Sequence, residues 1–114
     1  MNRKVVQVRP AATFLRRTRG LIRRPVLPDS VALHLAPCRC IHTGFMTRRI
    51  DVVFLGEGHM ILRIVEAMLP WRIAGHVRAG SVLEFNSGEV GRLGLRRGDE
   101  LKLVAHQEPC HVPT

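Results

Sequence analysis

Two apolar, β-prone runs separated by a short glycine-bearing loop constrain the fold of this chain more than any other feature. The runs are IDVVFL at residues 50–55 and MILRIVE at residues 60–66, and Gly56-Glu57-Gly58 lies between them. This pattern predicts a β-hairpin, because glycine supplies the backbone freedom that a short connection needs. MILRIVE has almost no polar face, so we expect it to be a central strand that is covered on both sides.

Other short segments extend this hairpin into a sheet with two helices. Five runs have strand composition and end at proline, glycine or polar turn residues: residues 4–9, 31–36, 40–46, 82–86 and 99–105. Ala11 to Arg19 has apolar positions at three- and four-residue spacing and predicts an N-terminal helix. Ser87 to Leu93 predicts a short second helix with Ser87 as its cap. The chain is therefore expected to be mostly β.

The length and composition predict one globular domain. The chain has 114 residues, of which 46% are hydrophobic, and one core can form at this size. We expect the domain to span residues 1–106 and residues 107–114, which show no pattern, to be a flexible tail. The first apolar run ends at Val8 and is too short for a secretory signal. We therefore expect a cytoplasmic protein without a membrane partner, whose three cysteines are free thiols.

The charge is strongly basic and unevenly distributed. Lys and Arg number 18 against 9 Asp and Glu, which gives a net charge of +9. Eight of the basic residues precede Asp29, the first acid in the chain. Such a patch attracts phosphates, nucleic acid or acidic proteins, although a solvated basic surface has the same composition.

The run CRCIHTGFM, residues 38–46, contains residue types that bind soft metal ions. In an extended strand alternate residues share one face, which would place Cys38, Cys40, His42 and Met46 together. Cys38 and His42 would nevertheless lie about 13 Å apart along the strand, too far for one ion. A site would need a sharp bend in the strand, and Cys110 and His111 could complete it only if the tail folded back. We therefore expect no metal and no other cofactor.

A thiol nucleophile is a second way to interpret this run. Cys40 and His42 would be neighbours on one face, which is the minimal requirement for activating a thiol. A third, orienting group is not identifiable in the sequence. We therefore assign no catalytic residue, expect a protein that is not an enzyme, and interpret the cysteines as small apolar side chains.

Several motifs in order resemble one known family. They are Arg19-Gly20-Leu21 with Arg24, then CIHTGFM, IDVVF, PWR, VLE with Gly88, and LGLRRGD. From about Ala12 to Leu103 the chain resembles the domain of unknown function 192 family of bacteria and archaea. The resemblance implies no established activity. It implies a compact, mostly β domain with a small barrel-like sheet and one or two helices. Together with the residue patterns, this predicts an α+β, mostly β fold with an antiparallel or mixed sheet, one N-terminal helix and one short C-terminal helix.

The segments CIHTGFM and PWR predict a ligand or partner site. The residues expected to line it are His42, Thr43, Met46, Asp51, Trp71 and Arg72. Gly44 leaves space on the strand face next to His42, so we expect a shallow pocket there with Arg72 as its positive charge. The predicted occupant is a small anionic or polar ligand, or an acidic protein partner.

Asp51 and Arg19 also have structural interpretations. Asp51 opens a strand before an apolar run, and we favour a role in accepting backbone N–H groups in the turn after Met46. Arg19 lies at the edge of the apolar stripe of the first helix. It is expected to pair with an acid such as Asp51 or Glu84, or else to bind an anion.

Three functions therefore stay open at the level of sequence. The first is a small cytoplasmic binding or accessory domain with its site at CIHTGFM and PWR. The second is nucleic-acid binding through the basic N-terminal helix and a cradle-type barrel, because residues 88–101 resemble swapped-hairpin regulators of the AbrB kind. Without a base-reading motif, such binding would be weak and indifferent to sequence. The third is the thiol or metal site at Cys40 and His42.

Overall fold

A computed structural model describes residues 3–10, 27–44 and 46–106 of the chain. Its strands are β1 (Arg3–Pro10), β2 (Val31–Leu35), β3 (Cys40–His42), β4 (Ile50–Leu55), β5 (Ile61–Met68), β6 (Ile73–Gly75), β7 (Ser81–Asn86) and β8 (Glu100–Ala105). Two short helices complete it, the 3-10 turn η1 (Glu57–His59) and α2 (Glu89–Leu93). The predicted helix over residues 11–19 and the predicted tail, residues 107–114, lie outside the described residues.

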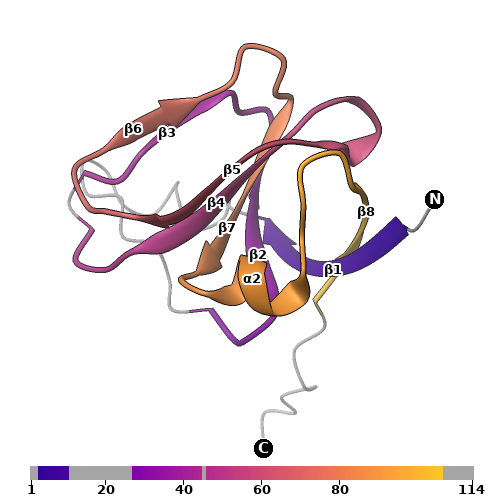
Figure 1. The fold of residues 1–114 in the computed structure, drawn as a ribbon, viewed down its shortest axis with the longest axis horizontal. Helices are drawn as coiled ribbons and strands as arrows, with labels where there is room; N and C mark the ends of the chain where they lie inside the picture. The colour runs from indigo at the N-terminus through magenta and orange to yellow at the C-terminus, as the bar shows by residue number, and fades with distance from the viewer. Residues whose placement is uncertain (1–2, 11–26, 45, 107–114) are drawn as a thin grey trace, which may run out of the picture.

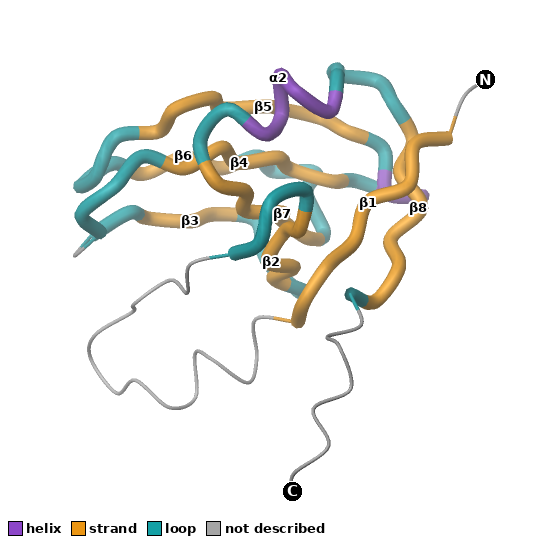
Figure 2. Tube along the Cα trace, turned by 90° about the horizontal axis from the view of Figure 1, so that it is seen from below, coloured by secondary structure: helices purple, strands orange, loops and turns teal. Residues whose placement is uncertain are grey.

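The strands form one large mixed sheet and one small ribbon. The large sheet has the order β5-β4-β7-β2-β1-β8, and β3 pairs with β6 in the ribbon. β1 is parallel to both β2 and β8, whereas every other pairing is antiparallel. Figures 1 and 2 show the β3–β6 ribbon at one end of the molecule and β1 and β8 at the other.

The expected barrel-like closure is wrong, because the sheet stays open. Its edge strands β5 and β8 meet at a single bridge between Met60 and Glu100. Next to this bridge, the Ile61 N–H donates to Asp99 O and the Gly98 N–H donates to Ile61 O, both at 2.8 Å. Beyond these contacts β5 pairs with β4 alone among the described strands, so the sheet curves without closing.

The core consists of two apolar clusters on the two faces of the sheet. One contains Leu33, Val52 and Phe54, and the other contains Val53 and Phe85 among its members. All six residues of β4 are buried, and its five apolar residues are divided between the two clusters. The strand covered on both sides is therefore β4, and the prediction that MILRIVE would be central is wrong. β5 is an edge strand whose interior residues are half-buried or exposed.

Most of the local predictions are confirmed. β4 and β5 form the predicted hairpin, and β1, β2, β7 and β8 coincide with predicted strands to within one or two residues. CIHTGFM forms a strand over Cys40–His42 alone, and β6 lies where a loop was expected. The predicted cap Ser87 is wrong, because the N-cap position is Gly88 and no side chain of that residue can cap. No helix among the described residues is long and apolar enough to cross a membrane.

Candidate functional site

Thr43 joins the CIHTGFM and PWR segments through its buried hydroxyl. Its Oγ1 donates to Leu69 O at 2.7 Å and accepts the Arg72 N–H at 2.8 Å. The backbone of Thr43 donates to Arg72 O at 2.9 Å and accepts the Trp71 N–H at 3.0 Å. Thr43 is fully buried. We therefore define the Thr43 clamp as these four hydrogen bonds, which fix the turn that carries Trp71 and Arg72.

Trp71 is exposed although its backbone adopts an unfavourable conformation. The residue is 63% exposed and its φ is 61°. The left-handed region costs a bulky residue about 1 to 2 kcal/mol. The Thr43 clamp holds Leu69 and Arg72 on the two sides of this position, so it stabilises the turn from which the indole projects.

The indole and the imidazole of His42 lie over Gly44. A Cβ built on Gly44 would lie 3.2 Å from His42 Nδ1 and 3.6 Å from an edge carbon of the Trp71 ring. The space beside Gly44 that the sequence predicted is therefore filled by these two rings. The Gly44 N–H donates to His42 Nδ1 at 3.3 Å. A neutral imidazole in this arrangement carries its proton on Nε2, which leaves that N–H as a donor.

The ribbon presents apolar side chains to solvent next to these rings. His42 lies opposite Ile73 in the ribbon. Of the two neighbouring pairs, Ile41–Ala74 faces inward and Thr43–Arg72 belongs to the Thr43 clamp. His42 and Ile73 form a non-hydrogen-bonded pair, in which the facing side chains lie close together. Ile73 is 77% exposed and Val77, after β6, is 85% exposed. We define the ribbon face as the exposed residues Arg39, Cys40, His42, Trp71, Ile73 and Val77.

A shallow hollow continues the ribbon face past the end of β6. It has a volume of about 310 Å³ and is lined by Arg39, Cys40, Gly75, His76 and Val77. A Cβ on Gly75 would lie 3.0 Å from the backbone oxygen of Arg39 and 3.4 Å from Cys40 Cβ. A larger residue at Gly75 would therefore push the two strands apart at this point.

Arginines near the ribbon face have no acidic partner among the described residues. Arg63 donates to Gly75 O at 2.8 Å and Arg72 donates to Trp71 O at 3.3 Å, and Arg39 makes no ion pair. These charges are therefore compensated by backbone dipoles or by solvent. The ribbon face therefore combines exposed apolar groups with nearby arginines that have no acidic partner among the described residues.

Three ion pairs lie on β1, α2 and the segment that leads into β8, away from the β3–β6 ribbon. Lys4 Nζ is 2.8 Å from Asp99, and Arg92 Nε is 2.7 Å from Glu89. The hydrogen bond from Arg92 lowers the pKa of Glu89, and the hydrogen bond from Lys4 lowers the pKa of Asp99. These acids compensate basic side chains of β1 and α2.

Asp51 has a structural role. Its carboxylate is fully buried and accepts the Ala67 N–H at 2.8 Å, the Gly88 N–H at 3.0 Å and the Val90 N–H at 3.1 Å. Asp51 therefore accepts backbone N–H groups, as predicted. These N–H groups belong to β5 and to the start of α2, however, and not to the turn after Met46. Asp51 replaces Ser87 as the cap of α2.

The remaining predicted residues fall into three groups. Met46 is buried in the core cluster that contains Phe54, so it does not form a wall of a surface pocket. Arg19 lies outside the described residues. Among the predicted site residues, His42, Trp71 and Arg72 are exposed and lie together at the ribbon. Ile73 and Val77 were not predicted, because nothing in an apolar residue's identity indicates that it is exposed.

Cys38 and Cys40 differ in exposure. Cys38 is half-buried against the core, and its Sγ donates to Cys40 O at 3.3 Å. Cys40 is exposed on the same face as His42. Within the described part of the chain, no three His, Cys, Asp or Glu side chains lie close enough together to hold a metal ion.

Two solved structures are similar to this chain. A protein of unknown function from Novosphingobium aromaticivorans DSM 12444 is 21% identical with a TM-score of 0.63, and the match covers 82% of this chain and 70% of that protein. A putative transcription regulator from Sinorhizobium meliloti 1021 is 22% identical with a TM-score of 0.63, over 83% of this chain and 78% of that protein. At these identities the likeness shows the fold alone.

No curated protein matches this chain. The model of one family, DUF192, described as "Uncharacterized ACR, COG1430", matches residues 1–103. That match covers most of the 114 residues and includes every strand of the large sheet and the ribbon except the last two residues of β8. The chain therefore belongs to the domain of unknown function 192 family.

Proposed function

We propose that this chain is a non-catalytic binding domain that docks an acidic segment of a partner protein on the ribbon face. The observation that carries the proposal is Trp71, an exposed indole held in a left-handed backbone conformation by the Thr43 clamp. An unfavourable backbone conformation that the surrounding structure enforces is typical of functional positions. Tryptophan is also the residue type that contributes most often to the energetic centre of protein interfaces.

Charge determines the kind of partner. The arginines next to the ribbon face have no acid to pair with among the described residues, and the Nε2–H of His42 is a further donor. An acidic segment would complement these groups, and electrostatic attraction would speed its association. The exposed Ile73 and Val77 would contact apolar side chains of the same segment.

Nucleic acid is the second candidate, and two observations favour it. The net charge is +9, and one structural neighbour is described as a putative transcription regulator. Binding to single strands usually requires several exposed aromatic rings for stacking. Among the described residues Phe54 and Phe85 are buried and Trp71 is the exposed one. The exposed Ile73 and Val77 fit a protein partner better, because aliphatic side chains neither stack on bases nor bind phosphate.

The test uses the fluorescence of Trp71, which is the sole tryptophan of the chain. An acidic, tryptophan-free peptide that contains leucine is titrated into the full-length protein, and its amide counterpart with Gln and Asn in place of the acids serves as the neutral comparison. Free glutamate and a single-stranded oligonucleotide of the same charge are titrated separately. We expect the acidic peptide to change the Trp71 emission saturably and at the lowest concentration of the four.

Matched arginine variants place the interaction on the surface. Arg72→Gln removes a charge beside Trp71, and Arg49→Gln removes the same charge at an exposed position outside the ribbon. We expect Arg72→Gln to weaken binding of the acidic peptide and Arg49→Gln to leave it nearly unchanged. Equal weakening by both variants would show that only net charge matters. Tighter binding of the oligonucleotide would replace this proposal with the nucleic-acid function.

A further inference from the structure

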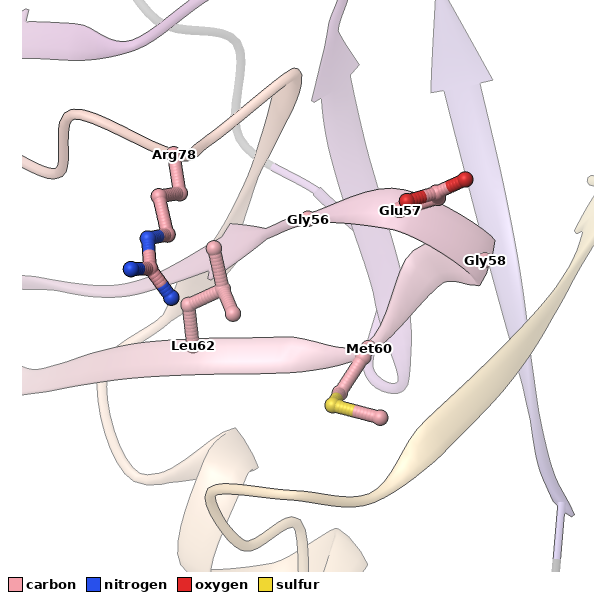
Figure 3. Close-up of a pocket in the computed structure, with 6 residues that line it drawn as sticks. All are labelled: Gly56, Glu57, Gly58, Met60, Leu62 and Arg78. Carbon is pink, nitrogen blue, oxygen red and sulfur yellow. The ribbon is translucent and has the colours of Figure 1, made fainter.

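A second and larger hollow lies on the other side of the β6–β7 connection from the ribbon face. It has a volume of about 680 Å³, and Figure 3 shows the residues that line it, Gly56, Glu57, Gly58, Met60, Leu62 and Arg78. This volume falls in the range of small-molecule sites. Val77 lines the hollow of the ribbon face, whereas its neighbour Arg78 lines this one. The two hollows therefore share a connection but no lining residue.

One wall of this hollow is apolar. Leu62 packs directly on the backbone of Gly56, where an added Cβ would lie 2.8 Å from a methyl carbon of Leu62. Because Gly56 has no side chain, the side chain of Leu62 can pack against the hairpin turn. Met60 also lines the hollow and is 38% exposed, but Figure 3 shows its side chain on the opposite side of the strand from Leu62. An alkyl group bound here would remove apolar surface of both the ligand and the protein from water.

Arg78 supplies a positive charge at one end of the apolar wall. Its guanidinium lies beside Leu62, and the carboxylate of Glu57 lies at the far end of the hollow (Figure 3). Among the residues that the structure describes, the guanidinium of Arg78 has no ion-pair or hydrogen-bond partner. A free guanidinium can bind a carboxylate through two parallel N–H bonds.

We propose that this hollow binds a short apolar carboxylate, with its alkyl part on Leu62 and the adjoining hairpin turn and its carboxylate on Arg78. The same chemistry occurs in a free aliphatic acid and in the last residue of a peptide, which combines an apolar side chain with a free carboxylate. The site is separate from the ribbon face and does not depend on the function proposed for that face. Glu57 disfavours ligands with a second negative charge at the far end.

The probes are hexanoate for the free acid and N-acetyl-leucine for the peptide end. Each is titrated into the ¹⁵N-labelled full-length protein, with hexanol and hexylamine as neutral and cationic comparisons. We expect hexanoate, N-acetyl-leucine or both to cause saturable shifts of the amides of Gly56, Gly58 and Leu62, and the two comparisons to bind more weakly. The tighter of the two carboxylates identifies the source of the natural ligand.

Variants at exposed positions assign the binding to named side chains. Arg78→Gln should weaken carboxylate binding by about fivefold or more, because a charge-assisted hydrogen bond is lost. Arg49→Gln, at an exposed position outside the hollow, should leave carboxylate binding unchanged. If neither carboxylate causes saturable shifts, the proposal is wrong. It is also wrong if hexylamine binds as tightly as hexanoate, or if Arg49→Gln weakens binding as much as Arg78→Gln.

Discussion

Replacing Thr43 with valine tests whether its hydroxyl holds the turn that presents Trp71. Valine keeps the shape of threonine but can neither donate to Leu69 O nor accept the Arg72 N–H, which lie 2.7 and 2.8 Å from Oγ1. Each lost hydrogen bond reduces stability by about 1 kcal/mol, and partly buried groups left without a partner add to this loss. We therefore expect Thr43→Val to lower the free energy of unfolding by about 2 to 3 kcal/mol.

Thr43→Ser is the matched control because serine keeps the hydroxyl and loses one methyl group. Its expected cost is about 1 kcal/mol. Urea unfolding of both variants, followed by far-ultraviolet circular dichroism, gives the two free energies. The Arg72 amide should also exchange with solvent faster in Thr43→Val than in Thr43→Ser, since its acceptor is removed in the first variant alone. If Thr43→Val is as stable as Thr43→Ser, the hydroxyl does not hold the turn and this reasoning is refuted.

Three further predictions concern other residues. Asp51→Ala should lower the free energy of unfolding by about 3 to 5 kcal/mol in a urea titration, because three buried N–H groups lose their acceptor; a loss below 1 kcal/mol would contradict the role of Asp51 as a cap. Iodide should quench Trp71 fluorescence more strongly than caesium does, since the exposed indole lies among positive charges, and equal quenching would argue against that charge. The pKa of Glu89 is lowered in the folded protein, so its contribution to stability is present above about pH 4.3, the ordinary glutamate value, and is lost as the pH falls through the folded-state pKa. Unfolding measured between pH 5 and pH 3 should therefore show a smaller loss of stability in Glu89→Gln than in the parent protein.

The strands of this chain could be predicted largely because β-branched runs and glycine or proline boundaries are local signals. β4 and the hairpin to β5 illustrate this. The position of each strand in the sheet is not determined by local sequence. MILRIVE has the composition of a central strand, yet β5 is an edge, because the strand that pairs with the free side of β4 is β7, more than 25 residues later. A strand of three residues such as β6 is too short for its period to be recognised.

The site could be predicted in part for the same reason. The motif CIHTGFM contains His42, and the motif PWR contains Trp71 and Arg72. These two motifs were predicted to form one site, and antiparallel pairing of β3 with β6 brings them together. Asp51 lies 37 residues before Gly88, whose N–H it accepts, so no local pattern around Ser87 could identify the cap of α2. Burial of Thr43 and Met46 likewise depends on the tertiary fold, and their residue types are compatible with either a core or a site.

Replacing His42 with alanine, and measuring stability and binding on the same sample, tests the central claim most directly. His42 is exposed on the ribbon face, and its imidazole lies beside Trp71 over Gly44. We expect the free energy of unfolding to change by less than about 1 kcal/mol. Affinity for the acidic peptide, followed through Trp71 emission, should fall by about fivefold or more. A loss of several kcal/mol in stability, or unchanged affinity in a fully folded variant, would contradict the claim that the ribbon face is a docking surface.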